Sequence, residues 1–328
     1  MDKLQRRKFL LASGALLAAP VSVLAQVTGP VRRVAWMGLG SPDAPSPYYD
    51  SLRAGLRDLG WIEGRNLVLA PFGSTGFPED AERAAREVSV FNPEVIVTQE
   101  ILVFAAQKQH PKTPVVFGFS GDPVQAKLVQ SFGRPGGALT GMTYLALDLV
   151  AKRIELLKEL VPNMQRLAVL ARPQHPGQEF ERRASEEAAA RLGVTPLFFP
   201  IHDVAEIEAA FSAMSAQRCD SLVVFPDFFL YINSARIARL ASAAKLPTVS
   251  GWAPFADNGI LLTYGPNIRD LYRGLARYVS RILHGATPAE LPVELPRSIE
   301  LVFNSVTARR LGIPLRQGIL VRADRIIK

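Results

Sequence analysis

The residues of this chain that could act chemically do not form a complete catalytic motif. Gly118-Phe119-Ser120-Gly121-Asp122 follows an apolar run and departs from the Gly-x-Ser-x-Gly nucleophile motif at its last position, which is Asp122. Gly38-Leu39-Gly40 also follows an apolar run, but Asp43 stands where a dinucleotide-binding loop has its third glycine. The chain contains no Gly-x-x-x-x-Gly-Lys phosphate-binding motif. These patterns favour neither a serine hydrolase nor a nucleotide-dependent enzyme, and we predict no cofactor.

Metal and redox chemistry also lack the residues that they need. Cys219 is the only cysteine, which excludes an intramolecular disulfide, a four-cysteine zinc site and a Cys-x-x-Cys redox pair. It precedes an apolar run, so we expect it in the core. The histidines are never at ligand spacing, and we expect each of them in a loop or at the surface: His110, His175, His202 and His284. We therefore predict no metal site.

The composition is that of an ordinary globular protein. Of the 328 residues, 48% are hydrophobic and 21% are charged, which excludes an intrinsically disordered chain. The formal net charge is +8, and part of it lies in the first 25 residues. The remaining basic residues are scattered through amphipathic segments instead of forming a stripe with aromatic residues. We therefore expect solvated helix faces and no nucleic-acid partner.

The first 25 residues are typical of an export signal. A basic stretch at residues 3–8 precedes a short apolar run at residues 9–19, and Val23-Leu24-Ala25 offers a small-residue cleavage pattern. We place the cut after Ala25; a buried N-terminal helix is the alternative. Arg6-Arg7 resembles a twin-arginine signal but lacks the usual preceding Ser or Thr, so Tat and Sec export both stay open. The mature chain is expected to be soluble and periplasmic.

The elements that must position any functional side chains alternate along the mature chain. Apolar runs of strand length alternate with segments in which apolar residues recur at helical spacing. We predict strands near residues 34–38, 66–69, 95–97, 115–117, 139–141, 167–170, 196–199, 222–225, 248–249, 260–262 and 299–302. We predict helices near residues 49–59, 78–91, 101–109, 149–161, 178–192, 204–217, 232–244 and 271–282, and one capped by Asp122 over 123–132. This alternation predicts an α/β fold with parallel sheets covered on both faces.

The two halves of the chain look like distant copies. A helix ends in Leu-Gly at Gly60 and again at Gly193, and a proline precedes a buried strand at Pro114 and at Pro247. The glycine and the proline are 54 residues apart in both halves. This repeat predicts two similar α/β lobes instead of one continuous sheet.

Loops at the carboxyl ends of parallel strands are where open α/β sheets bind ligands. We expect the two lobes to present these loops to a common cleft. The candidate ligand-binding residues are Gly40, Ser41, Gln99, Glu100, Ser120, Gly121 and Asp122 in the first lobe, Arg172, Asp227, Phe228 and Trp252 in the second, and Tyr144 and Tyr264 where the chain could cross between lobes.

The types of these residues suggest their roles. Asp227 suits an ammonium or hydroxyl group, whereas the hydroxyls of Ser120 and Ser41 can donate to oxygen atoms. The aromatic rings could stack on a ligand or pack in the core: Trp252, Tyr264 and Tyr144. Asp122 could cap its helix or contact the ligand.

Several short motifs lie in order across the mature chain: Gly55–Leu67, Gly121–Val124, Arg134–Gly141, Lys152–Lys158, Pro226-Asp227, Tyr264–Pro266, Leu291–Glu294 and Arg322–Asp324. These motifs resemble one family of ABC-transporter substrate-binding proteins, the periplasmic type I solute-binding proteins with tryptophan- and tyrosine-binding relatives. The resemblance implies two flavodoxin-like lobes with three crossovers, near Tyr144, Pro266 and residues 286–296. Lobe one would comprise residues 30–144 plus 266–287, and lobe two residues 146–264 plus 290–328.

The resemblance also implies a function. Such a protein captures a small molecule in the cleft by hinge closure, acts as a monomer, and delivers the ligand to a membrane permease with its ATPase. The chain departs from the family after its third strand, where a Gly-Thr/Ser-Pro type of turn is replaced by Thr98-Gln99-Glu100-Ile101-Leu102. Glu100 would repel an anion and favour a cation or a hydroxyl-rich ligand.

Two other functions stay open on the sequence. The same fold could report a ligand to a membrane receptor as a sensor or scaffold without transport. A secreted α/β enzyme could use Glu100 and Asp227 as an acid/base pair, provided that the two carboxylates face each other with shifted pKa values.

Overall fold

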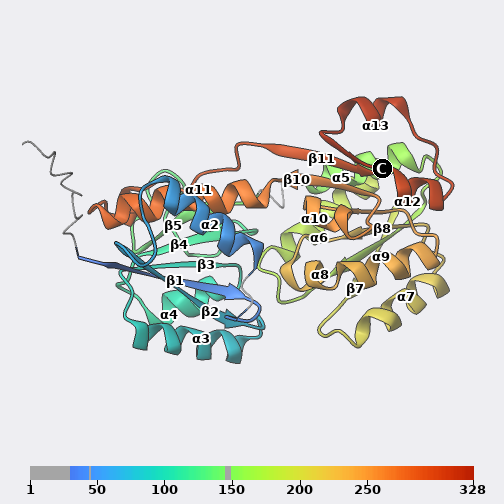
Figure 1. Ribbon diagram of the computed structural model, residues 1–328. Coiled ribbons are helices and arrows are strands. Elements are labelled where there is room, and N and C mark those ends of the chain that lie inside the picture. The colour runs from blue at the N-terminus through green and yellow to red at the C-terminus, as the bar shows by residue number, and fades with distance from the viewer. Residues whose placement is uncertain (1–29, 44–45, 145–148) are drawn as a thin grey trace, which may run out of the picture. The chain divides into compact units, whose positions relative to one another are not determined.

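The computed structural model describes residues 30–43, 46–144 and 149–328, and these form two α/β lobes, each built around its own sheet (Figure 1). The export signal predicted over residues 1–25 lies outside the described residues. None of the described helices combines the length and the apolar character that a membrane crossing requires.

The first lobe contains a five-stranded parallel sheet in the order β2-β1-β3-β4-β5. Its strands are β1 (Arg32–Leu39), β2 (Leu67–Ser74), β3 (Val95–Gln99), β4 (Val115–Phe119) and β5 (Leu139–Thr143). β3, β4 and β5 are buried along their whole length, as expected for apolar runs covered on both faces. The sheet reverses its order between β1 and β3, and such a switch point is where ligands bind in open α/β sheets.

Helices from distant parts of the chain cover this sheet. α3 (Pro78–Phe91) and α4 (Leu102–Gln109) pack together beside β1 to β4, and α2 (Pro47–Asp58) packs against α11 (Ile268–Leu283). α11 belongs to the last quarter of the sequence, yet it lies on β3, β4 and β5. Figure 1 shows it in orange across the blue and green first lobe.

The second lobe contains a seven-stranded sheet in the order β12-β11-β10-β9-β8-β6-β7. Its strands are β6 (Arg166–Ala171), β7 (Thr195–Pro200), β8 (Ser221–Val224), β9 (Thr248–Ser250), β10 (Leu262–Pro266), β11 (Ile299–Asn304) and β12 (Arg325–Ile327). β11 pairs antiparallel with β10, which differs from the wholly parallel sheet that the alternation predicts. The reason is topological: the chain leaves this lobe after β10, forms α11 on the first sheet, and returns from there as β11.

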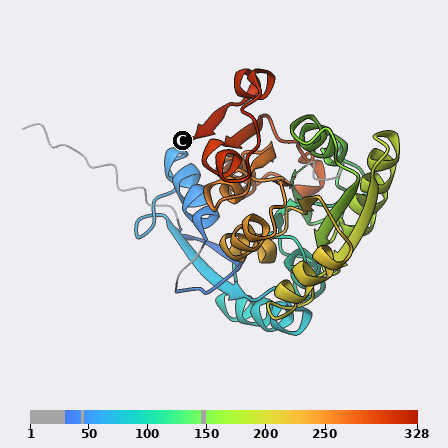
Figure 2. The same ribbon diagram turned by 90° about the vertical axis from the view of Figure 1, so that its right-hand side faces the viewer.

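The helices of the second lobe are short and numerous. They are α5 (Val150–Leu160), α6 (Gln178–Arg191), α7 (Glu206–Ala216), α8 (Phe228–Ile232), α9 (Ser234–Ala243), α10 (Ala253–Asp257), α12 (Ser305–Arg310) and α13 (Gln317–Arg322). A 3₁₀ turn at Pro288–Glu290 packs on β5 of the first lobe. Figure 2 views this lobe end-on, with the red C-terminal elements and the yellow region around α7 on separate sides.

The chain passes between the sheets at three places among the described elements: after β5, between β10 and α11, and between α11 and β11. The third passage lies beside β5, because Thr143 N–H donates to Glu294 O (3.0 Å) and Glu294 N–H donates to Gly141 O (3.1 Å). This arrangement agrees with the predicted crossover regions. The lobe boundaries given above stay a prediction.

One predicted helix is wrong. Residues 123–127 form turns, and Asp122 Oδ1 accepts the N–H groups of Val124 (2.7 Å) and Gln125 (3.1 Å). Lys127 adopts a left-handed conformation with φ 57°, which interrupts any helix through this segment. Asp122 is therefore a local cap of a turn.

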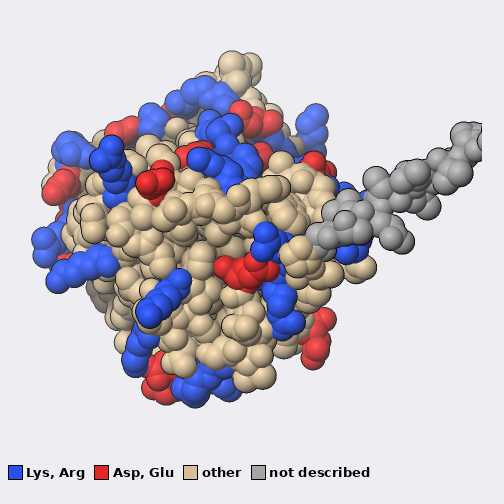
Figure 3. Space-filling model, turned by 90° about the vertical axis from the view of Figure 1, so that its left-hand side faces the viewer, with Lys and Arg blue, Asp and Glu red and all other residues tan. Residues whose placement is uncertain are grey.

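Surface charge on the first lobe is mixed. Figure 3 shows one face on which Lys and Arg side chains lie among Asp and Glu side chains. Exposed ion pairs of this lobe include Lys108 with Glu82 (2.6 Å) and Arg83 with Glu87 (2.7 Å). Pairs of this kind are screened by solvent and salt and contribute little to stability.

Candidate functional site

The candidate site lies where the strand ends of the first sheet meet loops of the second lobe. Glu100 follows β3 and Ser120 follows β4, and both are almost completely buried. Glu100 adopts φ 49°, a left-handed turn that directs the chain from β3 into α4. Ser120 Oγ donates a hydrogen bond of 2.6 Å to Glu100 Oε2. The structure thus brings two of the candidate residues into direct contact.

His175 reaches this pair from the second lobe. It lies in the loop between β6 and α6, and its Nδ1 is 3.5 Å from Ser120 Oγ. Its Nε2 is 3.1 Å from Glu181 Oε1, and its Nδ1 is 3.8 Å from Asp227 Oδ2. The imidazole thus joins two acidic residues of its own lobe to Ser120 of the other lobe.

His175 and His110 lie in loops, as expected, but the sequence did not indicate that they are buried. His175 is 3% exposed. His110 is also buried, with its Nε2 2.9 Å from Ala85 O. A histidine outside a periodic element carries no sequence signal of burial, so His175 could not be recognised from its neighbours.

Burial and neighbouring charge decide the protonation of this network. Burial raises the pKa of Glu100 to about 7, against the opposing effects of His175 and of the Ser120 hydrogen bond. Burial alone would lower the pKa of His175, but Glu181 and then Glu100 and Asp227 outweigh it and raise the pKa to about 9. His175 is therefore an imidazolium at neutral pH, and it donates towards Ser120 while Ser120 donates to Glu100.

These protonation states argue against nucleophilic catalysis. Ser120, His175 and Glu181 have the residue types of a Ser-His-acid triad. A protonated His175 cannot accept the serine proton, however, and the Ser120 hydroxyl is already directed to Glu100. No group of three or more His, Cys, Asp or Glu side chains able to hold a metal ion occurs in the described part of the chain. The arrangement is suited to holding charge and hydrogen-bonding groups in place.

Aromatic side chains from both lobes surround the network. Tyr144 OH lies 2.5 Å from Tyr272 OH, and Tyr272 OH donates to Gln99 Oε1. Because the hydroxyl of Tyr272 donates its hydrogen to Gln99, the hydroxyl of Tyr144 is the donor in the bond between the two tyrosines. The Tyr144 ring meets Trp252 edge-on at 5.9 Å, and Tyr48 stacks on Tyr272 at 5.1 Å.

Sequence reasoning missed two of these rings. Tyr48 belongs to α2 and Tyr272 to α11, and the two helices pack together although more than 200 residues separate them. A single sequence offers no signal for such a long-range meeting. The predicted helices near residues 49–59 and 271–282 did not single out either ring as buried.

Several polar atoms in this region are buried and have no hydrogen-bond partner among the described residues. They are Gln99 Nε2, Glu100 Oε1, Trp252 Nε1 and Tyr48 OH. Each such unpartnered atom lowers the stability of the fold by on the order of 1–3 kcal/mol relative to a hydrogen-bonded one. They offer both donors and an acceptor to a bound molecule.

The other predicted site residues lie at several places. Asp227 Oδ1 caps α8 by accepting the Leu230 N–H (3.1 Å), while its Oδ2 faces His175. Gly121 lies against the backbone of Gly177 in the opposite lobe. Tyr264 lies within β10, is half-buried and packs against the core of the second lobe. Gly40, Ser41, Arg172 and Phe228 line a separate cavity of about 500 Å³.

Comparisons with known proteins agree with this architecture. The model of the family described as ABC transporter substrate binding protein matches residues 37–327. A tyrosine-binding protein of Clostridioides difficile (strain R20291) is 22% identical over 260 residues, which are 79% of this chain and 74% of that protein.

Solved structures share the fold. A conserved domain protein from Vibrio cholerae O1 biovar El Tor superposes with a TM-score of 0.84 at 26% identity, covering 90% of this chain and 99% of that chain. An ABC domain from Streptococcus pneumoniae, solved in complex with L-Trp, gives a TM-score of 0.82 at 20% identity with the same coverage. The two-lobed fold is that of the type I periplasmic binding proteins.

Proposed function

Because the chain belongs to the family of ABC transporter substrate binding proteins, we propose that it captures an amino acid or a related small polar metabolite between its lobes and delivers it to a membrane permease with its ATPase. The predicted export signal and the family both support a periplasmic location. The family is one of binding proteins and not of enzymes.

One observation carries this proposal: the concentration of buried, unpartnered polar atoms at the meeting of the lobes. Gln99, Glu100, Trp252 and Tyr48 come from both lobes and are shielded from water in the described arrangement. Water would satisfy these atoms if the lobes separated. A ligand that satisfies them when the lobes close would offset their cost, so closure would depend on ligand.

The chemistry of these atoms describes the ligand. Glu100 Oε1 and the Asp227 carboxylate suit an ammonium or other N–H donor, whereas Gln99 Nε2 and Trp252 Nε1 suit an acceptor such as a carboxylate or carbonyl oxygen. The rings around them suit a flat apolar group. This combination fits an amino acid with an aromatic side chain, and the relatives named for tyrosine and L-Trp support that class.

The lobes would close by a hinge motion in the three passages of the chain between the sheets. Closure would bring His175 to Ser120 and complete the network across the interface. A dissociation constant near 1 μM, about 8 kcal/mol of binding free energy, is typical of capture from dilute solution.

The experiment is a thermal-shift panel on protein that has been unfolded, freed of co-purified ligand and refolded. The panel contains amino acids, small carboxylates, purines, sugars and polyamines. A ligand at 100 times its Kd adds about 2.7 kcal/mol and should raise Tm by several degrees. We expect amino acids to be the class that raises it.

Two matched variants connect the shift to the site. Glu100→Gln keeps the side-chain shape but removes the negative charge, and should weaken amino-acid binding at least tenfold. Glu187→Gln makes the same change at an exposed position of α6 and should leave binding unchanged. A panel without any shift on folded protein would contradict the proposal, as would equal effects of both variants.

A further inference from the structure

A cavity lies beside the polar network. It has a volume of about 500 Å³ and is lined by both lobes. The first lobe contributes the end of β1 and the loop after it (residues 39–42), the end of β2 and the loop after it (residues 73–75 and 77), and Asp80 and Arg83 of α3. The second lobe contributes Arg172 and one side of α8, with the exposed Ile232 at its rim. The surface that lines the cavity is mostly apolar.

Arg172 is an unusual residue for such a cavity. Its side chain is buried, and its guanidinium carbon lies 5.0 Å from the ring of Phe77 in the first lobe and 4.7 Å from the ring of Phe229 in the second. Neither Nε nor Nη2 has a hydrogen-bond partner among the described residues. Burial lowers the pKa of Arg172 and the charge of Asp227 opposes this, but an arginine stays protonated in proteins.

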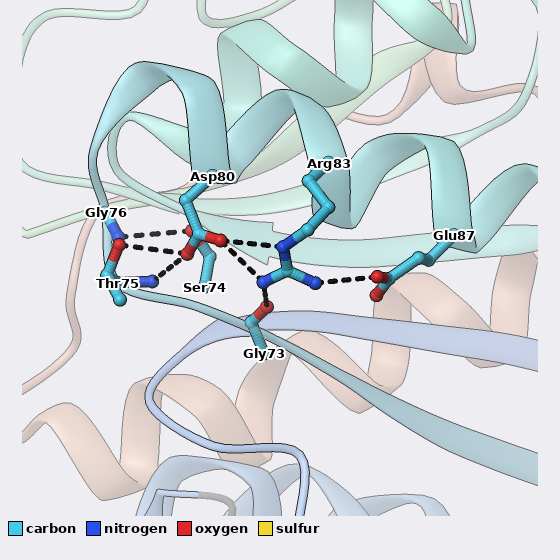
Figure 4. A network of polar contacts seen from close by, with 7 residues as sticks. All are labelled: Gly73, Ser74, Thr75, Gly76, Asp80, Arg83 and Glu87. Atoms are coloured by element: carbon cyan, nitrogen blue, oxygen red, sulfur yellow. Dashed lines mark hydrogen bonds and ion pairs between the residues drawn. The ribbon is translucent and has the colours of Figure 1, made fainter.

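The other charges that line the cavity are already paired (Figure 4). Asp80 accepts the N–H and the hydroxyl of Thr75 and pairs with Arg83 at 2.6 Å. Arg83 also bonds Gly73 O (3.2 Å) and Glu87 (2.7 Å). Arg172 is therefore the lining charge that lacks an ionic partner within the described part of the chain.

The same contacts hold in place the loop between β2 and α3, against which Arg172 packs through Phe77. Asp80 and Arg83 tie the loop between β2 and α3 to the first turns of α3, and Gly76 N–H donates to Ser74 Oγ (3.1 Å). Gly76 has φ 81°, and a Cβ there would clash with Leu39 Cδ2 at 2.7 Å and would be in ordinary contact with Arg172 Nη1 at 3.6 Å. The guanidinium of the second lobe therefore lies beside this loop of the first.

We propose that this cavity is a second binding subsite, which takes the carboxylate of an organic monoanion on Arg172 and its apolar or aromatic body against Phe77 and α8. The proposal rests on the proposed function, because it adds a subsite to the same interlobe cleft. The ligand reaches Arg172 while the lobes are apart, since Nε and Nη2 are shielded from solvent in the described arrangement.

The geometry of the guanidinium selects a carboxylate. Nε and Nη2 form one edge of the planar group, and such an edge bonds both oxygens of a carboxylate side by side. A phosphate dianion is less suited, because Arg172 is a single positive charge and the Asp80 carboxylate lies in the same lining. The two rings that flank the guanidinium exclude water and strengthen the interaction.

The test measures binding to the full chain by calorimetry with three probes. 3-Phenylpropionate carries the carboxylate and an aromatic body, 3-phenylpropionamide has the same shape without the charge, and inorganic phosphate has the charge without the body. We expect the acid to bind at least tenfold more tightly than the amide and phosphate not to bind.

Variants then assign the anion to its partner. Arg172→Gln should weaken binding of 3-phenylpropionate at least tenfold, and Arg172→Lys should retain part of it, because a lysine keeps the charge without the two-pronged edge. Arg191→Gln removes an exposed charge of the same lobe and should change nothing. Arg172→Lys also serves where Arg172→Gln fails to fold.

The proposal is overturned if the amide binds as tightly as the acid, if phosphate binds equally well, or if Arg172→Gln and Arg172→Lys bind the acid as the parent does. Amino acids measured on the same protein keep the two proposals distinguishable. Amino acids that bind through Glu100 while 3-phenylpropionate does not bind refute the second subsite and leave the proposed function standing. Binding of neither class refutes both.

Discussion

Ser120 Oγ lies 3.5 Å from His175 Nδ1, and this contact joins a strand end of the first lobe to a loop of the second. The contact belongs to a directed chain of hydrogen bonds, because the imidazolium donates to Ser120 and Ser120 donates to Glu100. A positive charge of one lobe thereby stabilises a carboxylate of the other. If the lobes separate as proposed, these two groups separate as well, so we expect the protonation of the hydrogen-bonded groups to depend on closure.

The buried ion pair of His175 with Glu181 should be far more important for stability than an exposed pair of the same types. His175→Gln removes the charge that faces Glu181, whose side chain is 0% exposed, and should lower the free energy of unfolding by about 3 kcal/mol. His202→Gln breaks the exposed pair with Glu206 and should change it by less than about 0.5 kcal/mol. Urea unfolding of the two variants measures both values. Equal losses would show that burial does not control the pair.

Stability should fall as the pH rises from 6.5 to 9.5. The folded pKa of His175 is raised from its ordinary 6.5 to about 9, chiefly by Glu181 acting against burial. A raised pKa gives stability that is complete below 6.5 and is lost as the pH rises through about 9. Urea unfolding at half-unit pH steps should show this loss in the parent and a smaller one in His175→Gln. A parent whose stability increases over the same range would contradict the assignment.

A methyl group at Gly118 should disturb the tyrosine network. A Cβ at this position would lie 2.4 Å from Tyr144 OH, so Gly118→Ala must displace the hydroxyl from Tyr272. We expect a loss of about 1–3 kcal/mol in the free energy of unfolding and at least tenfold weaker amino-acid binding. Gly133→Ala is the matched control, because a Cβ there meets nothing within 4 Å. Thermal melts with and without ligand measure both effects, and unchanged binding in Gly118→Ala would exclude Tyr144 from the site.

The sequence predicted most of the fold because apolar runs and helical stripes are local properties. β3 and β4 are buried on both faces, and their strand ends were correctly expected to carry Glu100 and Ser120. The helix expected after Asp122 was wrong. Val124, Leu128 and Phe132 have a helical spacing, but Lys127 adopts a left-handed conformation that interrupts a helix.

The partners of the site were harder to foresee. His175 is buried by residues of both lobes. Its local sequence, Pro173-Gln174-His175-Pro176, contains no pattern that predicts its contact with Ser120. Tyr272 reaches the site because α11 crosses back onto the first sheet after the chain has already built most of the second. Such meetings depend on the order of the strands, which local patterns do not determine.

Glu100→Gln should stabilise the ligand-free chain, and more strongly at high pH than at low pH. Burial raises the pKa of Glu100 to about 7, so at pH 8.5 the folded chain holds a buried carboxylate that the unfolded chain hydrates freely. The amide carries no charge and can still accept the Ser120 hydroxyl, and should raise the free energy of unfolding by roughly 1–3 kcal/mol at pH 8.5. At pH 5.5 the parent carboxyl is itself protonated when folded, and the advantage should shrink to less than half. Urea unfolding at the two pH values measures the difference, with Glu187→Gln expected to show no change at either. A gain that is equal at both pH values would mean that Glu100 keeps an ordinary pKa, and the ligand-linked role of its charge would have to be abandoned.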